Sequence, residues 1–241
     1  MKRKSCSCCL LLCAAVLLCA LSGCAGGKAQ TPVDALDAVR EAALQEKQID
    51  FSELGKINPD ICGWLVIPGM ALSEPVLRHP TDDAWYGAHA PDGSENAGGS
   101  VYCQPTYNGA DFTDPVTVLY GSEATPERQF SSLAKFWSED GSLQRAGEMR
   151  ICTPTGTLRY QAFGAGLYNS THILHDHNGF QKPGELESFL TAFRQYHSMS
   201  RQYDDGITLT DSDRVLILST HVPQNEDLRY LVVAKLVETT G

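Results

Sequence analysis

Two apolar stretches near the end of the chain, Val215-Leu-Ile-Leu-Ser-Thr220 and Arg229-Tyr-Leu-Val-Val-Ala-Lys-Leu236, decide the fold. Short runs rich in Val, Ile, Leu and Tyr are typical of β-strands, so we predict strands over Val215–Thr220 and Tyr230–Val237. Six upstream segments have the same character: Cys62–Ile67, Glu74–Arg78, Ser100–Gln104, Val116–Tyr120, Glu148–Thr153 and Leu158–Gly166. Eight short strands with few helices indicate a mainly β protein, built as a closed or nearly closed β-barrel.

Helical patterns precede these strands. Thr31 suits the N-cap of a first helix, Pro32 suits its first position, and Asp34 completes a capping box. A second, shorter helix follows and stops at Asn58-Pro59.

Two more helices interrupt the strands. A short one is predicted around 130–137, and a long amphipathic one over Glu185–Arg201. The apolar spacing of the long helix is i, i+3, i+4, i+7, carried by Leu186, Phe189, Leu190, Phe193 and His197. This helix falls between the sixth and seventh predicted strands.

The N-terminus has the pattern of an export signal. Three basic residues precede a short apolar stretch, Leu10–Leu21, which is too short to span a bilayer as a stable helix. The sequence Leu21-Ser-Gly-Cys24 resembles the bacterial lipobox, which implies cleavage before Cys24 and attachment of a diacylglycerol to its thiol. The alternative is an ordinary signal peptide with a chance cysteine. We predict a signal peptide over 1–23, a tether and N-terminal helix over 24–48, and a folded domain over 49–241.

The composition excludes some partners. The chain has 241 residues and a formal net charge of −10, and no basic stripe is present in the sequence. Nucleic-acid binding is therefore not expected.

Nine cysteines are present, but five lie within the predicted signal and Cys24 would carry the lipid. The remaining three, Cys62, Cys103 and Cys152, are too widely spaced for a disulfide framework or a zinc site. Each is interpreted as a buried small hydrophobe, and the pattern leaves open whether any two form a disulfide.

Several segments in order resemble the class B sortases, which are membrane-bound cysteine transpeptidases of Gram-positive bacteria. They are Ile57-Asn-Pro-Asp-Ile-Cys-Gly-Trp-Leu-Val-Ile-Pro-Gly69, Glu74-Pro-Val-Leu-Arg78, Gly99-Ser-Val-Tyr102, Thr117-Val-Leu-Tyr-Gly121, and the two stretches quoted first. The resemblance runs from about residue 49 to residue 237. It implies an eight-stranded sortase-type barrel, with the long helix between strands six and seven.

The resemblance also implies three active-site positions. In that family a histidine follows Tyr-Gly, a cysteine follows Ser-Thr, and an arginine opens the last strand. Here these positions hold Ser122, His221 and Arg229, so only the arginine matches. A thioacyl intermediate needs a thiolate nucleophile, and losing a nucleophile of this kind removes several orders of magnitude of rate.

We therefore expect a catalytically inactive relative that binds a peptide or cell-wall protein at the outer face of the bacterial cytoplasmic membrane. It would be anchored by lipid at Cys24 and would need no cofactor. A first alternative is an acyl-transfer enzyme in which Ser122 is the nucleophile, His221 the general base and Arg229 the oxyanion ligand. A second alternative is an accessory structural lipoprotein whose groove binds nothing.

Three histidines lie close together in the sequence, at His172, His175 and His177. Histidine-rich tracts can bind zinc, but this spacing fits no zinc-enzyme signature. We interpret the segment as a solvated loop, keep the three residues as weak metal candidates, and predict no metal site.

Overall fold

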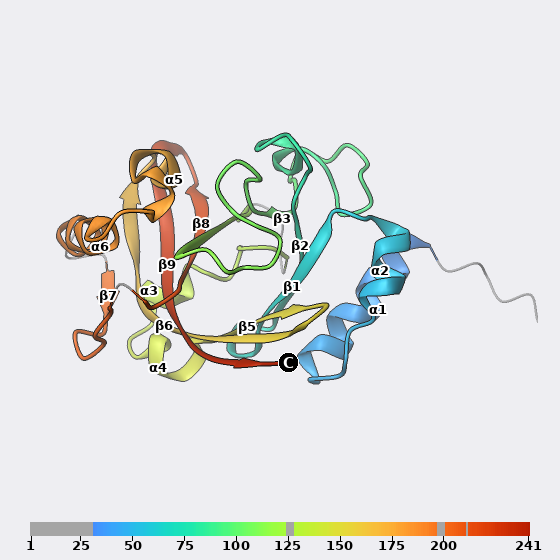
Figure 1. Cartoon of the computed structure of the whole chain (residues 1–241), viewed down its shortest axis with the longest axis horizontal. Helices are drawn as coiled ribbons and strands as arrows, with labels where there is room; N and C mark the ends of the chain where they lie inside the picture. The colour runs from blue at the N-terminus through green and yellow to red at the C-terminus, as the bar shows by residue number, and fades with distance from the viewer. Residues whose placement is uncertain (1–30, 124–127, 197–200, 211) are drawn as a thin grey trace, which may run out of the picture. The chain divides into compact units, whose positions relative to one another are not determined.

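The computed structural model describes residues 31–123, 128–196, 201–210 and 212–241, apart from the Trp137 side chain. The strands are β1 (Ile61–Ile67), β2 (Leu72–Leu77), β3 (Val101–Tyr102), β4 (Val116–Tyr120), β5 (Glu148–Thr153), β6 (Gly156–Asn169), β7 (Arg201–Tyr203), β8 (Val215–Val222) and β9 (Asn225–Thr240). The helices are α1 (Pro32–Leu44), α2 (Phe51–Ile57), α3 (Lys135–Ser138), α4 (Ser142–Ala146), α5 (Ile173–Asp176) and α6 (Glu185–Gln195). Figure 1 shows their arrangement.

The strands form a closed barrel. They are hydrogen-bonded in the order β5-β1-β2-β3-β4-β8-β9-β6-β7, and β5 also pairs with β6. This last pairing closes the first eight strands of the order into a ring and leaves β7 outside it. The predicted mainly β, eight-stranded barrel is confirmed.

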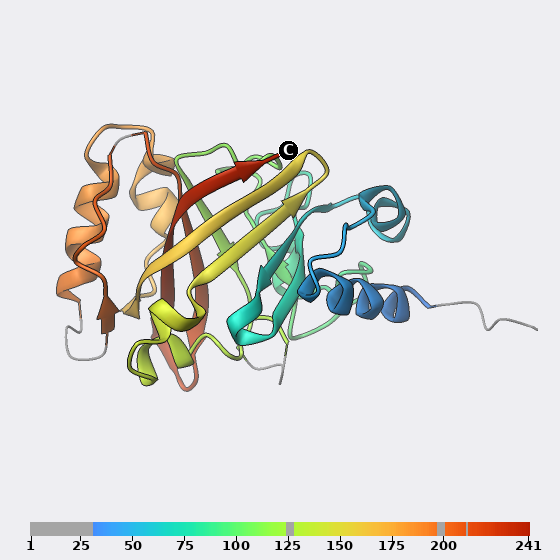
Figure 2. The ribbon, with the colours of Figure 1, turned by 90° about the horizontal axis from the view of Figure 1, so that it is seen from below.

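Side chains alternate between the inside and the outside of the barrel along each strand. On β8, Leu216 and Leu218 belong to the interior core, whereas Val215 and Ile217 belong to the cluster beneath α5 and α6. These two helices cover one side of the barrel, and α1 and α2 lie on the opposite side (Figure 2). The outer face of β4, β8 and β9 is therefore partly covered by helices.

The N-terminal helices form from local signals and pack on β1 and β2. Thr31 and Asp34 make the predicted capping box at the start of α1. Leu36 of α1 and Leu54 of α2 are buried with Trp64 of β1 in one apolar cluster. The indole N–H of Trp64 donates a hydrogen bond to Ser73 Oγ at 2.9 Å, which satisfies its only polar atom.

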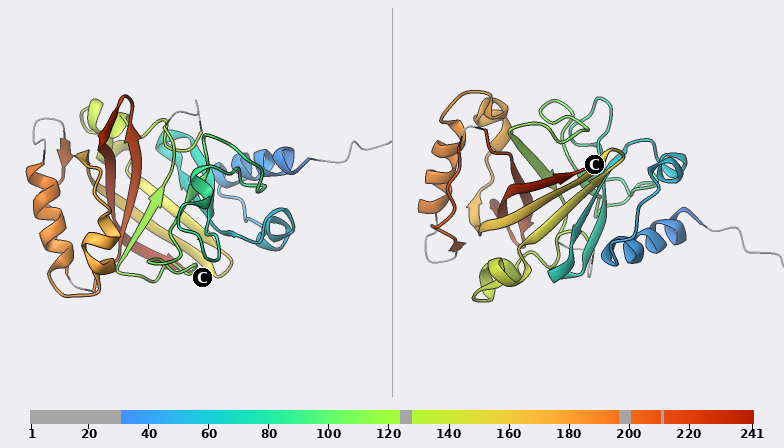
Figure 3. Two further views of the ribbon diagram at one scale, coloured as in Figure 1. Left: turned by 90° about the horizontal axis from the view of Figure 1, so that it is seen from above. Right: turned by 60° about the horizontal axis from the view of Figure 1, so that its bottom comes forward.

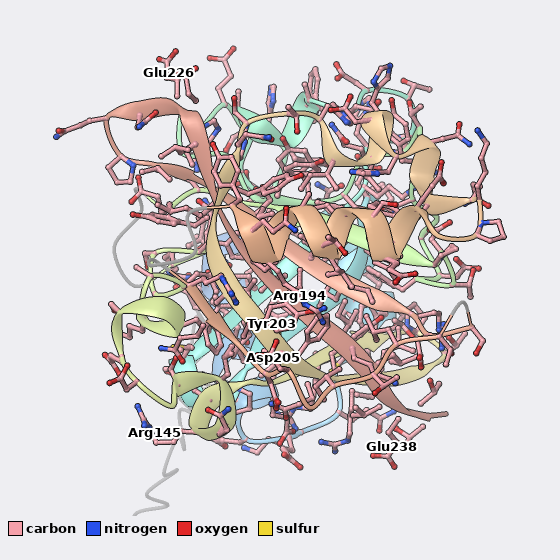
Figure 4. The ribbon with its side chains drawn as sticks, turned by 90° about the vertical axis from the view of Figure 1, so that its left-hand side faces the viewer. Arg145, Arg194, Tyr203, Asp205, Glu226 and Glu238 are labelled. Carbon is pink, nitrogen blue, oxygen red and sulfur yellow. The ribbon has the colours of Figure 1, made fainter. Side chains whose placement is uncertain are left out.

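The structure corrects three expectations about local elements. The long helix ends at Gln195, and Arg201 begins β7 instead of ending the helix. β7 was not predicted because its three residues, Arg-Gln-Tyr, carry no apolar alternation. It pairs with Gly164–Gly166 of β6, and Arg194 of α6 lies 4.3 Å from the centre of the Tyr203 ring (Figure 4).

The third correction concerns the short helix predicted around 130–137. It is reduced to α3, Lys135–Ser138, which follows a series of turns. Phe130, Leu133 and Phe136 are nevertheless buried in the interior core. Their apolar character therefore reflects packing against the barrel more than helical periodicity.

The predicted signal peptide and Cys24 lie outside the described residues, as does His197. The domain boundaries at 24 and 49 stay predictions. Within the ranges that the structure describes, no helix has the length and apolar character needed to cross a membrane.

Trp64 provides a test of how the N-terminal helices are held. Trp64→Ala should destabilise the fold by about 3–5 kcal/mol, because it empties a fully buried site beneath α1 and α2. Trp85→Ala is the control, because that indole keeps 38% of its surface exposed and should cost much less. Urea unfolding of both variants measures the difference, and equal losses would contradict this account.

Candidate functional site

The strand register brings four side chains into one row on the outer face of the barrel. Tyr102 of β3 faces Tyr120 of β4, Tyr120 faces Ser219 of β8, and Ser219 faces Leu231 of β9. Paired residues point to the same side of a sheet, and Leu231 lies in the outer cluster. The row therefore lies on the outside, beside the surface that α5 and α6 cover; β4, β8 and β9 lie side by side in Figure 3.

Two residues further along β8 and two residues back along β9, the same face of the sheet carries His221 and Arg229. His221 of β8 faces Arg229 of β9, which in turn faces Tyr168 of β6. Ser122 lies just past the end of β4, where the Gly121 N–H donates to the Ser219 carbonyl at 3.2 Å. Because β4 and β8 are neighbouring parallel strands, their carboxyl ends bring Ser122 and His221 to the same edge of the sheet.

Apart from Leu231 and Tyr168, these residues line one groove of about 290 Å³. Ser122, His221 and Arg229, the three candidates from the sequence, all contribute to it. The other lining residues are Gly87, Ala97, Gly98, Gly99, Ser100, Tyr102, Gln104, Tyr120, Gly121, Ser170, Thr171, His172, Ile173 and Ser219. We refer to this feature as the outer-face groove.

Gln129 holds one wall of the groove, and no sequence pattern singles it out. Its Oε1 accepts the Ser122 N–H at 2.7 Å, and its Nε2 donates to the carbonyls of Gly98 and Gly99 at 2.9 and 3.0 Å. The side chain is buried, and the backbone has a φ of +47°, which is unusual for a residue with a Cβ. Gln129 therefore fixes the backbone of Ser122 against the glycine segment.

A buried carboxylate anchors Gln129 in turn. Glu74 of β2 accepts the Gln129 N–H at 3.1 Å and the Arg40 guanidinium at 2.8 Å. Asp37 bridges Arg40 and Arg128, and these arginines, Arg128 first, lower the pKa of Asp37. The helix α1 is thus joined to the groove wall through paired charges.

Both a cation and nearby carboxylates act on the groove residues: Arg229 on one side, and Glu226, Asp82 and Asp83 on the other. Partial burial and then the Arg229 charge lower the pKa of His221, while Glu226 acts in the opposite direction. Burial raises the pKa of Tyr102 and of Tyr120, so both phenols stay protonated near neutral pH. The groove therefore offers a guanidinium, a neutral imidazole and hydroxyl donors.

The predicted Ser122–His221 pair shares the groove. A nucleophile and its base must come within about 3 Å for proton transfer. A catalytic role for the two residues together stays a prediction.

The three clustered histidines have separate roles. His172 lines the groove and caps α5, its Nδ1 accepting the His175 N–H at 3.0 Å. His175 contacts Asp176, and His177 stacks on Phe180. In the described ranges, no group of three or more His, Cys, Asp or Glu residues is placed to hold a metal ion.

The described cysteines lie away from the groove. Cys103 is buried in the interior core, and Cys62 packs against that core. The neighbouring Cys103 thiol, and then burial, raise the pKa of Cys62. Cys152 faces Trp64 on the side of α1 and α2. No thiol of the described chain lines the groove.

Known proteins resemble this chain both in sequence and in structure. No protein-family model matches the chain. Sortase B of Listeria monocytogenes is 23% identical over 209 residues, which is 83% of this chain and 79% of that protein. Sortase B of Staphylococcus aureus is 22% identical over 198 residues, covering 79% of this chain and 75% of its own length.

Solved structures match over most of the chain. A Staphylococcus aureus sortase B–substrate complex has a TM-score of 0.68 at 20% identity, covering 85% of this chain and 95% of the other. Clostridium perfringens sortase B has a TM-score of 0.63 at 22% identity, covering 78% and 100%.

The closed barrel, with its groove at the ends of β4 and β8, thus defines a sortase-type β-barrel protein. The sequence matches narrow the similarity further: over about four fifths of its length, the chain is similar in sequence to the sortase B proteins. Its sortase-type fold is established, and Ser122, His221 and Arg229 stand where the resemblance places the family's active site.

The Arg229 charge on His221 can be measured. In Arg229→Gln the pKa of His221 should rise, because the second cause of its depression is removed while partial burial remains. Histidine ring resonances followed by NMR across the acid range give both values. An unchanged or lower pKa in the variant would contradict the proximity of the two groups.

The lowered pKa of His221 also makes the free energy of unfolding depend on pH. Because the pKa of His221 in the folded chain lies below the ordinary 6.5, the unfolded chain binds more protons over that interval. Stability should therefore fall as the pH drops through 6.5 towards the folded pKa, and His221→Gln should remove this part of the loss. Urea unfolding of both chains at a series of pH values measures it, and identical pH profiles would show that His221 makes no such contribution.

Proposed function

We propose that this protein binds a peptide in the outer-face groove without carrying out cysteine transpeptidation. The observation that carries the proposal is the absence of a thiol from the described lining of the groove, where His221 follows Ser219-Thr220. Thioacyl chemistry requires a thiolate at the reacting carbon, and an imidazole cannot replace it. The fold is kept, while position 221 holds an imidazole and none of the described lining residues carries a thiol.

Peptide binding is supported by the groove and by the relatives. Its glycine segment, its two tyrosines and its hydroxyls offer backbone contacts, aromatic surface and hydrogen bonds. Related structures include a Staphylococcus aureus sortase B–substrate complex and a sortase B complexed with triglycine. Gln129 already holds Ser122, Gly98 and Gly99 by hydrogen bonds, and such preorganisation of a binding wall favours affinity.

The proposed location is the outer face of the bacterial cytoplasmic membrane. The basic start, short apolar stretch and Leu21-Ser-Gly-Cys24 support cleavage and lipidation at Cys24. Two acyl chains anchor a protein stably, since each buried methylene contributes about 0.8 kcal/mol. The folded domain would then present its groove to peptides of the cell envelope.

A second candidate function is supported by one observation. Ser122 and His221 line the same groove beside Arg229. If substrate binding closed the gap between them, Ser122 could transfer its proton to His221 and attack an acyl carbon, with Arg229 beside the developing oxyanion. We rank this function below simple binding because a nucleophile at 122 would attack from the side opposite the family's cysteine position, for which the oxyanion donors are placed.

Peptide assays separate the two functions. The wild-type chain should bind an Asn-Pro or Leu-Pro sorting-type peptide and leave it intact, as followed by fluorescence anisotropy and mass spectrometry. Ser122→Ala should leave this binding within about twofold, because the serine is not needed as a nucleophile. Turnover that is lost in both Ser122→Ala and His221→Ala, but kept in Cys103→Ala, would establish the dyad instead.

Fractionation tests the anchor. The native protein should sediment with membranes and enter the detergent phase, and Cys24→Ala should release it or leave it unprocessed. Cys62→Ala serves as the control, because that thiol lies inside the folded domain. Wild-type protein recovered from the medium after cleavage at another residue would refute lipidation at Cys24.

A further inference from the structure

The outer-face groove has an unusual charge for this protein. The chain carries 29 acidic and 19 basic residues, yet none of the described residues that line the groove is acidic. The lining holds one permanent cation, Arg229, and two histidines, His172 and His221. The described lining of the groove is therefore more basic than the chain as a whole, although Asp82, Asp83 and Glu226 lie near enough to act on its side chains.

Arg229 is not neutralised by the described part of the chain. Its guanidinium has five N–H donors, but no ion pair or side-chain hydrogen bond to another described residue is present. It is half-buried, so it has lost part of its hydration. A partly desolvated guanidinium with unused donors is a site for an anionic ligand, and the planar fork matches a carboxylate.

Hydroxyl groups surround this cation. Tyr102 and Tyr120 line the groove with ring centres 5.6 Å apart. Burial raises the pKa of both phenols, and the Arg229 charge acts on both in the opposite direction to Asp83. Ser219 also lines the groove; it is 1% exposed, and its Oγ has no hydrogen-bond partner among the described residues. Buried hydroxyls are normally paired, so this unpaired hydroxyl marks a place for an acceptor.

We propose that the groove binds a carboxylate carried by a peptide, with the Arg229 guanidinium as the main ligand and His221 as a second cation. This rests on the proposed function, which supplies the peptide. An anionic ligand is inferred because position 221, where the class B sortases have a cysteine, holds a histidine here. Its imidazole lies opposite Arg229 on the β8–β9 ladder. The free C-terminus of a peptide and an Asp or Glu side chain both supply this chemistry.

The proposal includes a pH dependence. A bound carboxylate stabilises the protonated form of His221, so binding takes up a proton and should tighten as the pH falls below neutrality. The charged and titratable groups facing the ring are Arg229, which opposes protonation, and Glu226, which favours it; His172 and Tyr120 line the same groove. Glu226 lies at the β8–β9 hairpin and points away from the barrel (Figure 4).

The test compares one peptide in two forms. The full chain in mild detergent is titrated by calorimetry with a sorting-type peptide that ends in a free carboxylate and with its C-terminal amide. The acid should bind roughly tenfold or more tightly, because a hydrogen-bonded ion pair replaces a neutral contact. A third peptide, amidated at its C-terminus and carrying one aspartate, distinguishes the two carboxylate sources. Its only carboxylate is on a side chain, so tight binding of this peptide would identify the side chain as a sufficient source.

Variants assign the effect to the groove. Arg229→Gln should remove the preference for the acid form. The matched control is Arg145→Gln, because Arg145 is an exposed arginine on α4, away from the groove lining (Figure 4). His221→Gln should keep the preference for the acid over the amide. It should weaken the rise in affinity as the pH falls from about 7.5 to about 5.5, a range that brackets the ordinary histidine pKa of about 6.5.

The outcomes separate the two proposals. Equal binding of the acid and the amide would overturn the carboxylate assignment and leave peptide binding intact. Binding of neither form would contradict the proposed function itself. Displacement of the peptide by inorganic phosphate but not by acetate would also overturn the assignment, because it would mark a phosphate site.

Discussion

The candidate site depends on the parallel pairing of β4 with β8, in which Tyr120 faces Ser219. Side chains in a strand alternate at every residue, so a shift of one position would turn Ser219 and His221 into the barrel. The interior core prevents that shift, because Leu216 and Leu218 must remain buried there. Packing inside the barrel therefore sets the geometry of the groove on its outside.

The groove wall depends on a second constraint, the buried carboxylate of Glu74. A buried charge is costly unless it is paired and hydrogen-bonded, and Arg40 and the Gln129 N–H supply those partners. This joins α1, β2 and the Gln129 loop into one polar unit beside the site. The N-terminal helix is thus part of the structure that supports the groove, although it lies on the other side of β2 from the strands that carry His221 and Arg229.

Fold and chemistry are controlled by different residues here. The barrel needs apolar residues at the alternating inner positions, and these are present throughout. Ser122 and His221 stand just past the last core residues of β4 and β8, where packing places few demands on residue type. A sortase-type fold can therefore persist while the residues at its active-site positions change, because function is carried by the site and not by the fold.

The sequence by itself determined the eight barrel strands and the capped first helix, because local alternation and capping chemistry are encoded by neighbouring residues. Ser122, His221 and Arg229 were singled out only by the resemblance to the class B sortases. Only the tertiary structure decided that Gln129 and the two tyrosines complete the groove, that β7 forms, and that the long helix ends at Gln195. These features depend on hydrogen bonds and strand pairings between residues far apart in the chain. A left-handed residue in a loop and a three-residue polar strand carry no periodic signal, so their conformation is fixed by the partners that folding brings to them.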